Sequence, residues 1–309
     1  MGIGPPAIEL YRILRDNHHL DGLKSVVELG SQDIPLSDWH QNWARDYIES
    51  ITGEAALAPI TAEMFHKSLG FTDYCCIDAD GNNGALVFDL NLDLRETYGF
   101  DKQFDLVTNH GTSEHVFNQY SCFKNVHNLL RVGGLALHAV PFEGYLNHCF
   151  FNYQPSLFID ISIANRYELI GMWYHSQRKS KRFKYRGDNW VPLHYTDDLL
   201  VVLDELCRQG KMLSSPLNNF SLLSVVYRKT SDDLFRIPFD ARFSENNKIG
   251  NNYIESSVAR RNTMYTTADH LREVNSHLGR ITLMDLIRGA LREPKTLSNR
   301  FRKMLFSRF

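Results

Sequence analysis

Four apolar runs of the sequence end in polar residues that could bind a small molecule. The runs are SVVELG, DYCCID, GALVFD and FDLVTN, and they end in Glu28 with Gly30, in Asp78, in Asp89 and in Asn109. Short apolar runs of this kind are typical of strands that are buried on both faces of a parallel sheet. Because ligands of such sheets bind outside the carboxyl ends of the strands, we expect these side chains to surround one crevice.

The elements that must position these residues follow from the spacing of the apolar residues. Strands are expected at residues 26–29, 73–78, 85–90, 104–109, 135–141, 167–175 and 221–229. Helices are expected at residues 8–15, 37–51, 61–69, 113–131, 155–166 and 196–209, with a partly helical connection over 91–100. The clearest helical face, in the helix over 113–131, is formed by Val116, Tyr120, Phe123, Val126 and Leu130. Strands that alternate with helices predict an α/β sandwich with a mostly parallel sheet.

The composition is typical of a globular protein. Of the 309 residues, 43% are hydrophobic and 23% are charged. No apolar stretch reaches the roughly 20 residues that a membrane span needs, and the start of the chain lacks the pattern of a secretory signal. Five cysteines, an odd number without CxxC spacing, argue against a disulfide framework and a structural zinc site. These features predict a cytoplasmic protein.

Charge is distributed unevenly along the chain. Residues 276–309 carry a net charge of +6, so residues 1–275 carry −8. The acidic body disfavours an extended nucleic-acid surface, whereas the basic tail could dock on the domain, on a second subunit or on an anionic membrane. A second basic run, residues 178–186, could grip phosphates or form a solvated loop. The oligomeric state is left open.

A dinucleotide is one candidate ligand for the crevice. Its G-x-G-x-x-G fingerprint needs two further glycines after Gly30, but the chain continues with Ser31, Gln32 and Asp33. Asp33 would also repel a pyrophosphate at this position. Asp78 lies 48 residues after Gly30, whereas the acid of the fingerprint follows after about 20 residues. A nicotinamide-dependent oxidoreductase is therefore disfavoured.

Five segments together resemble the class I S-adenosylmethionine-dependent methyltransferases. They are VVELGSQDI, YCCIDADG, LVFDLN, FDLVTNHGTSEHV and LLRVGGLALHAVP, and they span about residues 20–230. The resemblance implies a Rossmann-like sheet of seven strands in the order 3-2-1-4-5-7-6, with strand seven antiparallel. It implies S-adenosyl-L-methionine as the cofactor, whose lack of phosphate explains why the further glycines can be absent. The cofactor-binding domain would cover residues 1–240, and residues 241–309 would form a helical, basic C-terminal extension.

The resemblance also assigns the cofactor-binding residues. The methionine part of the cofactor would face Glu28, Gly30, Ser31 and Gln32. Asn109 would meet the methionine amine through its carbonyl, next to the sulfonium, and His110 follows it in the cofactor-binding set. Asp78, followed by Ala79, would accept hydrogen bonds from both ribose hydroxyls, because a carboxylate offers two acceptor oxygens and no donor. Asp89 would accept from the adenine amino group, with the backbone of Leu90 beside the ring. A lone acid at a strand end is more often a helix cap or a turn former, but four polar groups at successive strand ends favour a binding site.

Methyl transfer is an in-line displacement in which positioning supplies much of the rate. An oxygen or nitrogen acceptor also needs a base to remove its proton. We expect His110 and His148 to be the catalytic candidates, with His115 and His138 as further histidines nearby. The pair Glu114-His115 matches an acid–histidine pair that many members of the resembled family carry after strand four, often in a structural role.

A metal site is a further alternative at the same pair. The small-RNA 3′-end 2′-O-methyltransferases hold Mg²⁺ with an E-x-x-E-H core and a second histidine. This chain has Glu114-His115 and a later His148, but Gly111 occupies the position of the first glutamate. Because one ligand is missing, no metal site is predicted.

Residues 142–195 are the predicted acceptor pocket. They contain 13 aromatic residues in 54, twice the aromatic share of the whole chain. Phe158 and Trp173 are expected to be core residues, whereas residues 145–153 could belong either to the core or to the pocket. The sequence therefore predicts methyl transfer to a small or carrier-borne acceptor, with oxygen as the target atom of a glycan or natural-product intermediate. The alternative is a catalytically inactive methyltransferase-like scaffold.

Overall fold

The computed structural model of the chain describes residues 2–57, 59–145, 147–178, 188–192 and 219–239. Its strands are β1 (Ser25–Leu29), β2 (Asp73–Ile77), β3 (Phe104–His110), β4 (Leu130–Glu143), β5 (Glu168–Arg178), β6 (Asp188–Pro192) and β7 (Asn219–Arg228). Its helices are α1 (Pro5–Asp16), α2 (Asp38–Thr52), α3 (Ala62–Ser68), α4 (Leu94–Tyr98), α5 (Gln119–Leu129) and α6 (Pro155–Ala164). Two single 3₁₀ turns, η1 (Asn82–Gly84) and η2 (Ser113–His115), complete the described elements.

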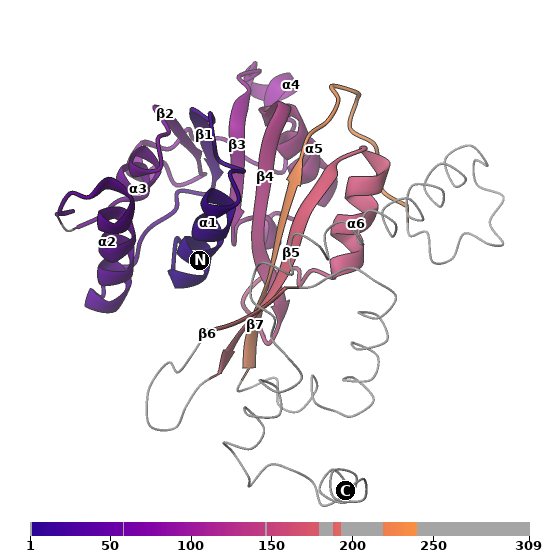
Figure 1. Ribbon diagram of the computed structural model, residues 1–309. Coiled ribbons are helices and arrows are strands. Elements are labelled where there is room, and N and C mark those ends of the chain that lie inside the picture. Colours follow the sequence, from indigo (N-terminus) through magenta and orange to yellow (C-terminus); the bar gives the residue numbers. More distant parts are fainter. Residues whose placement is uncertain (1, 58, 146, 179–187, 193–218, 240–309) are drawn as a thin grey trace, which may run out of the picture. The chain divides into compact units, whose positions relative to one another are not determined.

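The strands form one mixed sheet in the order β2-β1-β3-β4-β7-β5-β6 (Figure 1). β1 is parallel to β2 and β3, and β3 is parallel to β4. β7 runs antiparallel to both of its neighbours, β4 and β5. The predicted α/β fold is thus confirmed, and six of the seven expected strands occur in the expected order.

The expected strand over residues 85–90 does not form. Leu86 alone pairs with Ile77, and its N–H donates to the carbonyl of Cys76 over 2.9 Å. The chain turns away directly afterwards, because Phe88 N–H donates back to the Leu86 carbonyl and Asp89 accepts from the N–H of Asn91. β6, which the sequence did not predict, is the seventh strand of the observed sheet.

Helices cover the sheet on both faces, which is why its strands read as continuous apolar runs. Beneath α1, α2 and α3 lies a buried cluster that includes Tyr11, Val26, Phe65, Leu106 and Leu137. On the other face α5 and α6 meet. There the Phe123 and Phe158 rings lie 5.9 Å apart, and both contact His138 of β4.

The helix predicted over 113–131 is shorter than expected. Its first residues form η2, and α5 begins only at Gln119, where the Asn118 side chain caps it by accepting from Ser121 N–H. Tyr120, expected on the apolar face, is 47% exposed. The Asn109 side chain, which holds the backbone of η2, explains the interruption.

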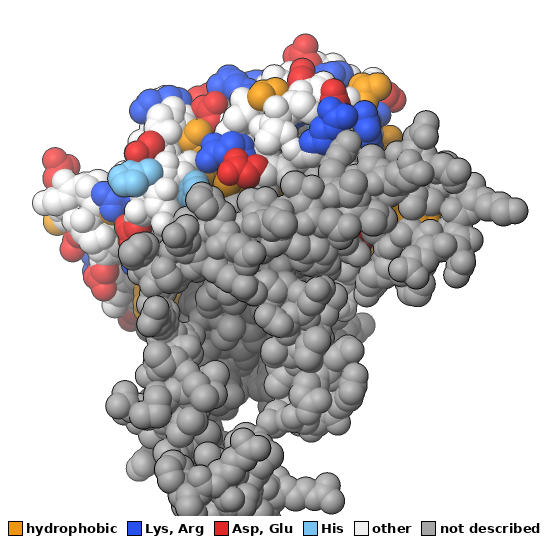
Figure 2. Space-filling view, turned by 45° about the vertical axis from the view of Figure 1, so that its right-hand side comes forward, with side chains coloured by type: hydrophobic (Ala, Val, Ile, Leu, Met, Phe, Trp, Pro, Cys, Tyr) orange, Lys and Arg blue, Asp and Glu red, His pale blue; other side chains and the backbone are white. Residues whose placement is uncertain are grey.

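Several predicted features lie outside the described residues: the helix over 196–209, most of the basic run 178–186, and the extension 241–309. α6 and β5 belong to the sheet domain, so only part of residues 142–195 is an insertion. Among the described residues, no helix is long and apolar enough to cross a membrane. Figure 2 shows Lys and Arg interspersed with Asp and Glu on the described part of one face, so the charge there is mixed.

Substitutions of Phe150 and Phe158 test which part of the segment after β4 belongs to the core and which part lies at the surface. Phe158 is fully buried, whereas Phe150 is 66% exposed. Phe158→Ala should lower the free energy of unfolding by about 3–5 kcal/mol through lost burial and a cavity. Phe150→Ala should lower it by less than about 1 kcal/mol. Urea unfolding of both variants checks this, and equal losses would contradict the assignment of Phe158 to the core.

Candidate functional site

The loop after β1 and the end of β2 lie against each other. The N–H of Gly30 donates to the Ile77 carbonyl over 2.7 Å, and the N–H of Ser31 donates to Asp78 Oδ2 over 2.8 Å. The side chain of Asn83 in η1 adds a bond to Ser31 Oγ. The structure therefore brings together Gly30, Ser31 and Asp78, three of the residues that the sequence assigns to one crevice.

Gly30 also passes close to the loop after β3. Its φ is +82°, and a Cβ here would collide with Thr112 Oγ1 and lie 2.8 Å from Gln32 Nε2. Thr112 Oγ1 donates to the Leu29 carbonyl over 2.6 Å, and Gln32 Nε2 donates to the same carbonyl over 3.0 Å. Only glycine meets both requirements, a left-handed backbone and the close approach of a neighbouring side chain.

Glu28 lies in a buried network of polar side chains rather than at the surface. Its Oε2 accepts a hydrogen bond from Tyr74 over 2.7 Å, and its Oε1 has no hydrogen-bond partner among the described residues. His66 Nδ1 lies 3.6 Å from Oε1 but donates to the Ala62 carbonyl. His66 Nε2 is then left to accept from the hydroxyl of Tyr11.

Burial decides the charge states in this network. Burial raises the pKa of Glu28 to about 8 and lowers the pKa of His66 to about 4. Both side chains are therefore neutral near pH 7, and their 3.6 Å approach is no ion pair.

His110, a predicted catalytic residue, is also buried and borders this network. Its Nε2 lies 3.4 Å from the Tyr11 hydroxyl, and its Nδ1 has no partner among the described residues. Burial lowers the pKa of His110 to about 3, so its imidazole is neutral and a weak base.

Asn109 is fully used by the protein. Its Oδ1 accepts from the N–H groups of Thr112 and Ser113, and its Nδ2 donates to Ser113 Oγ and to His138 Nδ1. The other ring nitrogen of His138 is bonded to the Tyr227 hydroxyl. The predicted contact between the Asn109 carbonyl and a cofactor stays a prediction, while the observed role of the Asn109 side chain is to hold the turn η2.

Asp89 and Ala79 are exposed, and no hydrogen bond within the described residues connects Asp89 with Gly30 or Asp78. Asp89 Oδ1 accepts from the N–H and the side chain of Asn91, and Leu90 is buried beneath. Asn91 in turn accepts from the N–H of Asn118, which connects this segment to the start of α5.

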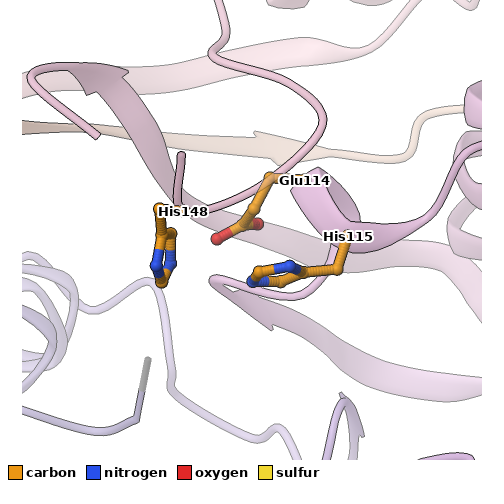
Figure 3. A group of neighbouring side chains, drawn as sticks. All are labelled: Glu114, His115 and His148. Atoms are coloured by element: carbon orange, nitrogen blue, oxygen red, sulfur yellow. The ribbon is translucent and has the colours of Figure 1, made fainter. Parts of the chain in front are cut away.

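A second polar group lies at η2. Glu114 and His115 belong to this turn, and His148 comes from the segment after β4. One ligand atom from each of the three lies within 4.8 Å of the others. In Figure 3 both imidazole rings flank the carboxylate of Glu114. The carboxylate is buried, both of its oxygens lack a hydrogen-bond partner among the described residues, and burial raises its pKa to about 7.

The aromatic segment 145–153 is partly core and partly surface. Tyr153 is buried, and its hydroxyl is hydrogen-bonded to Ser113 Oγ of η2. Phe150 is exposed and contacts the equally exposed ring of Phe117, with centroids 6.0 Å apart. An exposed pair of aromatic rings thus lies beside the histidine cluster.

Sequence reasoning missed Tyr11, His66, Tyr74 and Thr112. Their positions carry no local signal, because a polar residue on a helix or strand face reads as solvent-exposed until the packing is known. Thr112 alone had an indication, since it lies inside the HGTSEH segment.

Comparison with known proteins places the chain beside methyltransferases of solved structure. These include a SAM-dependent methyltransferase from Archaeoglobus fulgidus, with 11% identity and a TM-score of 0.41 over 72% of this chain and 94% of that one. They also include the StiE O-MT, with 15% identity and a TM-score of 0.37 over 83% of this chain and 80% of that one. A third is TehB from Haemophilus influenzae, with 10% identity and a TM-score of 0.38 over 71% of this chain and 62% of that one. No protein-family model and no curated protein matches the chain.

Alanine substitutions at Gly22 and Gly30, which both have positive φ, distinguish the cost of a strained backbone from the cost of a steric collision. Gly22→Ala meets no atom within 4 Å and should cost only the left-handed backbone, about 1–2 kcal/mol. Gly30→Ala should cost about 1–3 kcal/mol more, because its Cβ collides with Thr112. Urea unfolding measures both. If the collision with Thr112 is the cause, the Gly30→Ala substitution should cost less free energy of unfolding in the Thr112→Ala background than in the wild type. Equal costs in the two backgrounds would contradict this explanation.

The buried Glu28 should make stability fall as pH rises from about 6.5 to 8. In this range the unfolded chain has lost the Glu28 proton, while the folded chain retains it until about pH 8. The expected slope is about 1.4 kcal/mol per pH unit for this group. Lower pH is avoided because His66 and His110, neutral when folded, take up protons on unfolding and give the opposite slope.

Glu28→Gln should remove this part of the slope, as measured by urea unfolding across the same pH range. Glu63→Gln, at an exposed position of α3, serves as the matched control and should leave the slope unchanged. Parallel pH profiles for Glu28→Gln and the wild type would show that Glu28 is already ionised in the folded protein.

Proposed function

We propose that the chain binds S-adenosylmethionine at the carboxyl edge of its sheet and transfers the methyl group to a small or carrier-borne acceptor, at an oxygen atom. The observation that carries this proposal is the contact between the loop after β1 and Asp78, with Ser31 N–H and Asp78 Oδ2 2.8 Å apart. It occurs in a sheet in which six of the seven strands expected of class I methyltransferases lie in the expected order. The glycine loop and the acid thus meet where ligands of α/β sheets bind.

The donor and acceptor groups present here suit this cofactor. Asp78 is half-buried and, among the described residues, accepts from the N–H groups of Ser31 and Asp80, which leaves lone pairs for the two hydroxyls of a ribose. Gln32 Oε1 is buried beside Gly30 without a partner among the described residues, and a methionine ammonium would supply the missing donor. When bound, the cofactor supplies a methyl group activated by its sulfonium. The protein orients that group and the acceptor.

The two predicted catalytic histidines suit different roles. His110 is buried with a pKa of about 3, so it is a poor base for a hydroxyl acceptor at neutral pH. His148 is exposed, lies beside Glu114 and His115, and is accessible to an acceptor. The exposed rings of Phe117 and Phe150 next to it would hold an apolar part of the acceptor.

The two ends of β2 offer a matched test of cofactor binding. Asp78 follows β2 at the proposed site, and Asp73 begins the same strand at the opposite end, paired with Lys102 at the surface. Asp78→Asn keeps an acceptor for Ser31 N–H but cannot accept from both ribose hydroxyls. The loss of one charged hydrogen bond should raise the Kd for S-adenosylmethionine about 10- to 100-fold. Asp73→Asn should leave it unchanged.

Isothermal titration of S-adenosylmethionine and of S-adenosylhomocysteine into the three proteins checks this prediction. Titration of NAD into the wild type tests the nicotinamide reading in the same experiment. An inactive scaffold would show no heat with S-adenosylmethionine in the wild type, and equal affinities of the two variants would remove Asp78 from the site.

A further inference from the structure

We propose that Glu114, His115 and His148 bind one divalent first-row transition metal ion, such as zinc or cobalt, at the carboxyl edge of the sheet. The sequence alone predicts no metal site, because Gly111 occupies the position of the first glutamate of the E-x-x-E-H core. The structure instead places three ligands from two separate segments of the chain in one cluster.

The backbone brings the two segments together. Glu114 and His115 are adjacent in η2, and the N–H groups of Phe150 and Phe151 donate to the Glu114 carbonyl over 3.0 and 3.3 Å. These bonds hold His148 beside the turn, where its ring lies 5.1 Å from that of His115. Figure 3 shows the Glu114 carboxylate directed into the space between the two rings.

Among the described residues, nothing occupies the lone pairs of the Glu114 carboxylate, so they are available to a cation. Glu114 is 0% exposed, and neither of its oxygens has a hydrogen-bond partner among the described residues. Burying an unpaired carboxyl group costs free energy, so such groups in proteins are paired or coordinate metals. The side chains of His115 and His148, which lie beside the Glu114 carboxylate, are metal ligands in their neutral form.

The ligand set selects the class of ion. Two imidazoles and one carboxylate suit zinc, iron and cobalt, whereas magnesium prefers an all-oxygen shell. Metal bonds of about 2.0–2.2 Å set ligand atoms about 3.3 Å apart in a tetrahedral site. The observed atoms lie within 4.8 Å, and both imidazoles are exposed, so rotation of their side chains can close the difference.

The support under the site is fixed. Asn109 Oδ1 accepts from two successive N–H groups at the start of η2. Below the turn, the Tyr153 hydroxyl bonds to Ser113 Oγ and to Gln119 Oε1 over 2.9 and 2.7 Å. A ligand pair held this way can coordinate an ion without reordering the backbone.

Three protein ligands leave coordination positions open. In a role that rests on the proposed function, an open position would take an oxygen atom of the methyl acceptor and orient it. A metal-bound acceptor oxygen would lose its proton more readily and so would not need a strong base. The buried His110 is not such a base.

Metal binding can be measured on the tag-free full chain without S-adenosylmethionine. The protein is stripped with EDTA, dialysed, and titrated with CoCl₂ by visible absorption and with ZnCl₂ by calorimetry. One equivalent should bind, with cobalt bands of a four- or five-coordinate site. Glu114→Gln and His148→Gln should each weaken binding about tenfold or more, since even the loss of a group that only supports a ligand weakens binding 10- to 100-fold.

Two controls keep the outcome clear. His18→Asn changes an exposed histidine at positive φ, which asparagine tolerates, and should bind metal like the wild type. His148 is exposed, so His148→Gln should keep the wild-type melting temperature. Asp78→Asn should weaken S-adenosylmethionine binding about 10- to 100-fold but keep the metal, so failure of either proposal leaves the other measurable. Stoichiometric binding that survives in the Glu114→Gln, His148→Gln double variant, or no binding at all, would overturn the site.

Discussion

The absence of a side chain at residue 30 is the constraint on which the arrangement of the site depends. Gly30 lies between β2, where its N–H reaches Ile77, and the loop after β3, where Thr112 occupies the space of a Cβ. Thr112 in turn reaches back to the Leu29 carbonyl. The ends of β1, β2 and β3 are thereby connected at one edge of the sheet.

The sequence predicted the strands that are buried on both faces, because their apolar runs are unambiguous. It was wrong at residues 85–90, where only Leu86 joins the sheet. An edge segment contributes few apolar contacts, so local turns such as the one at Asp89 decide its course. The early helix start at Ser113 failed for a similar reason, since Asn109 takes over the first N–H groups of that turn.

The candidate site was predictable where residues follow strands and unpredictable where tertiary packing supplies the partners. Gly30, Ser31 and Asp78 meet as expected. Glu28 was expected to face a ligand, but Tyr74 and His66 surround it, and neither residue could be connected with it along the sequence. The same limit applies to His148, which is far from Glu114 along the chain. The hydrogen bonds from the N–H groups of Phe150 and Phe151 to the Glu114 carbonyl bring the two segments together.

Those two backbone hydrogen bonds attach the segment that follows His148 to the turn η2. Phe150 and Phe151 are fastened to the carbonyl of the residue whose carboxylate would hold the metal, while the Phe150 ring faces solvent. A molecule bound to this ring would contact the segment that carries His148, so acceptor binding and metal binding at the proposed site would be coupled. By linkage, each would change the affinity of the other by the same factor.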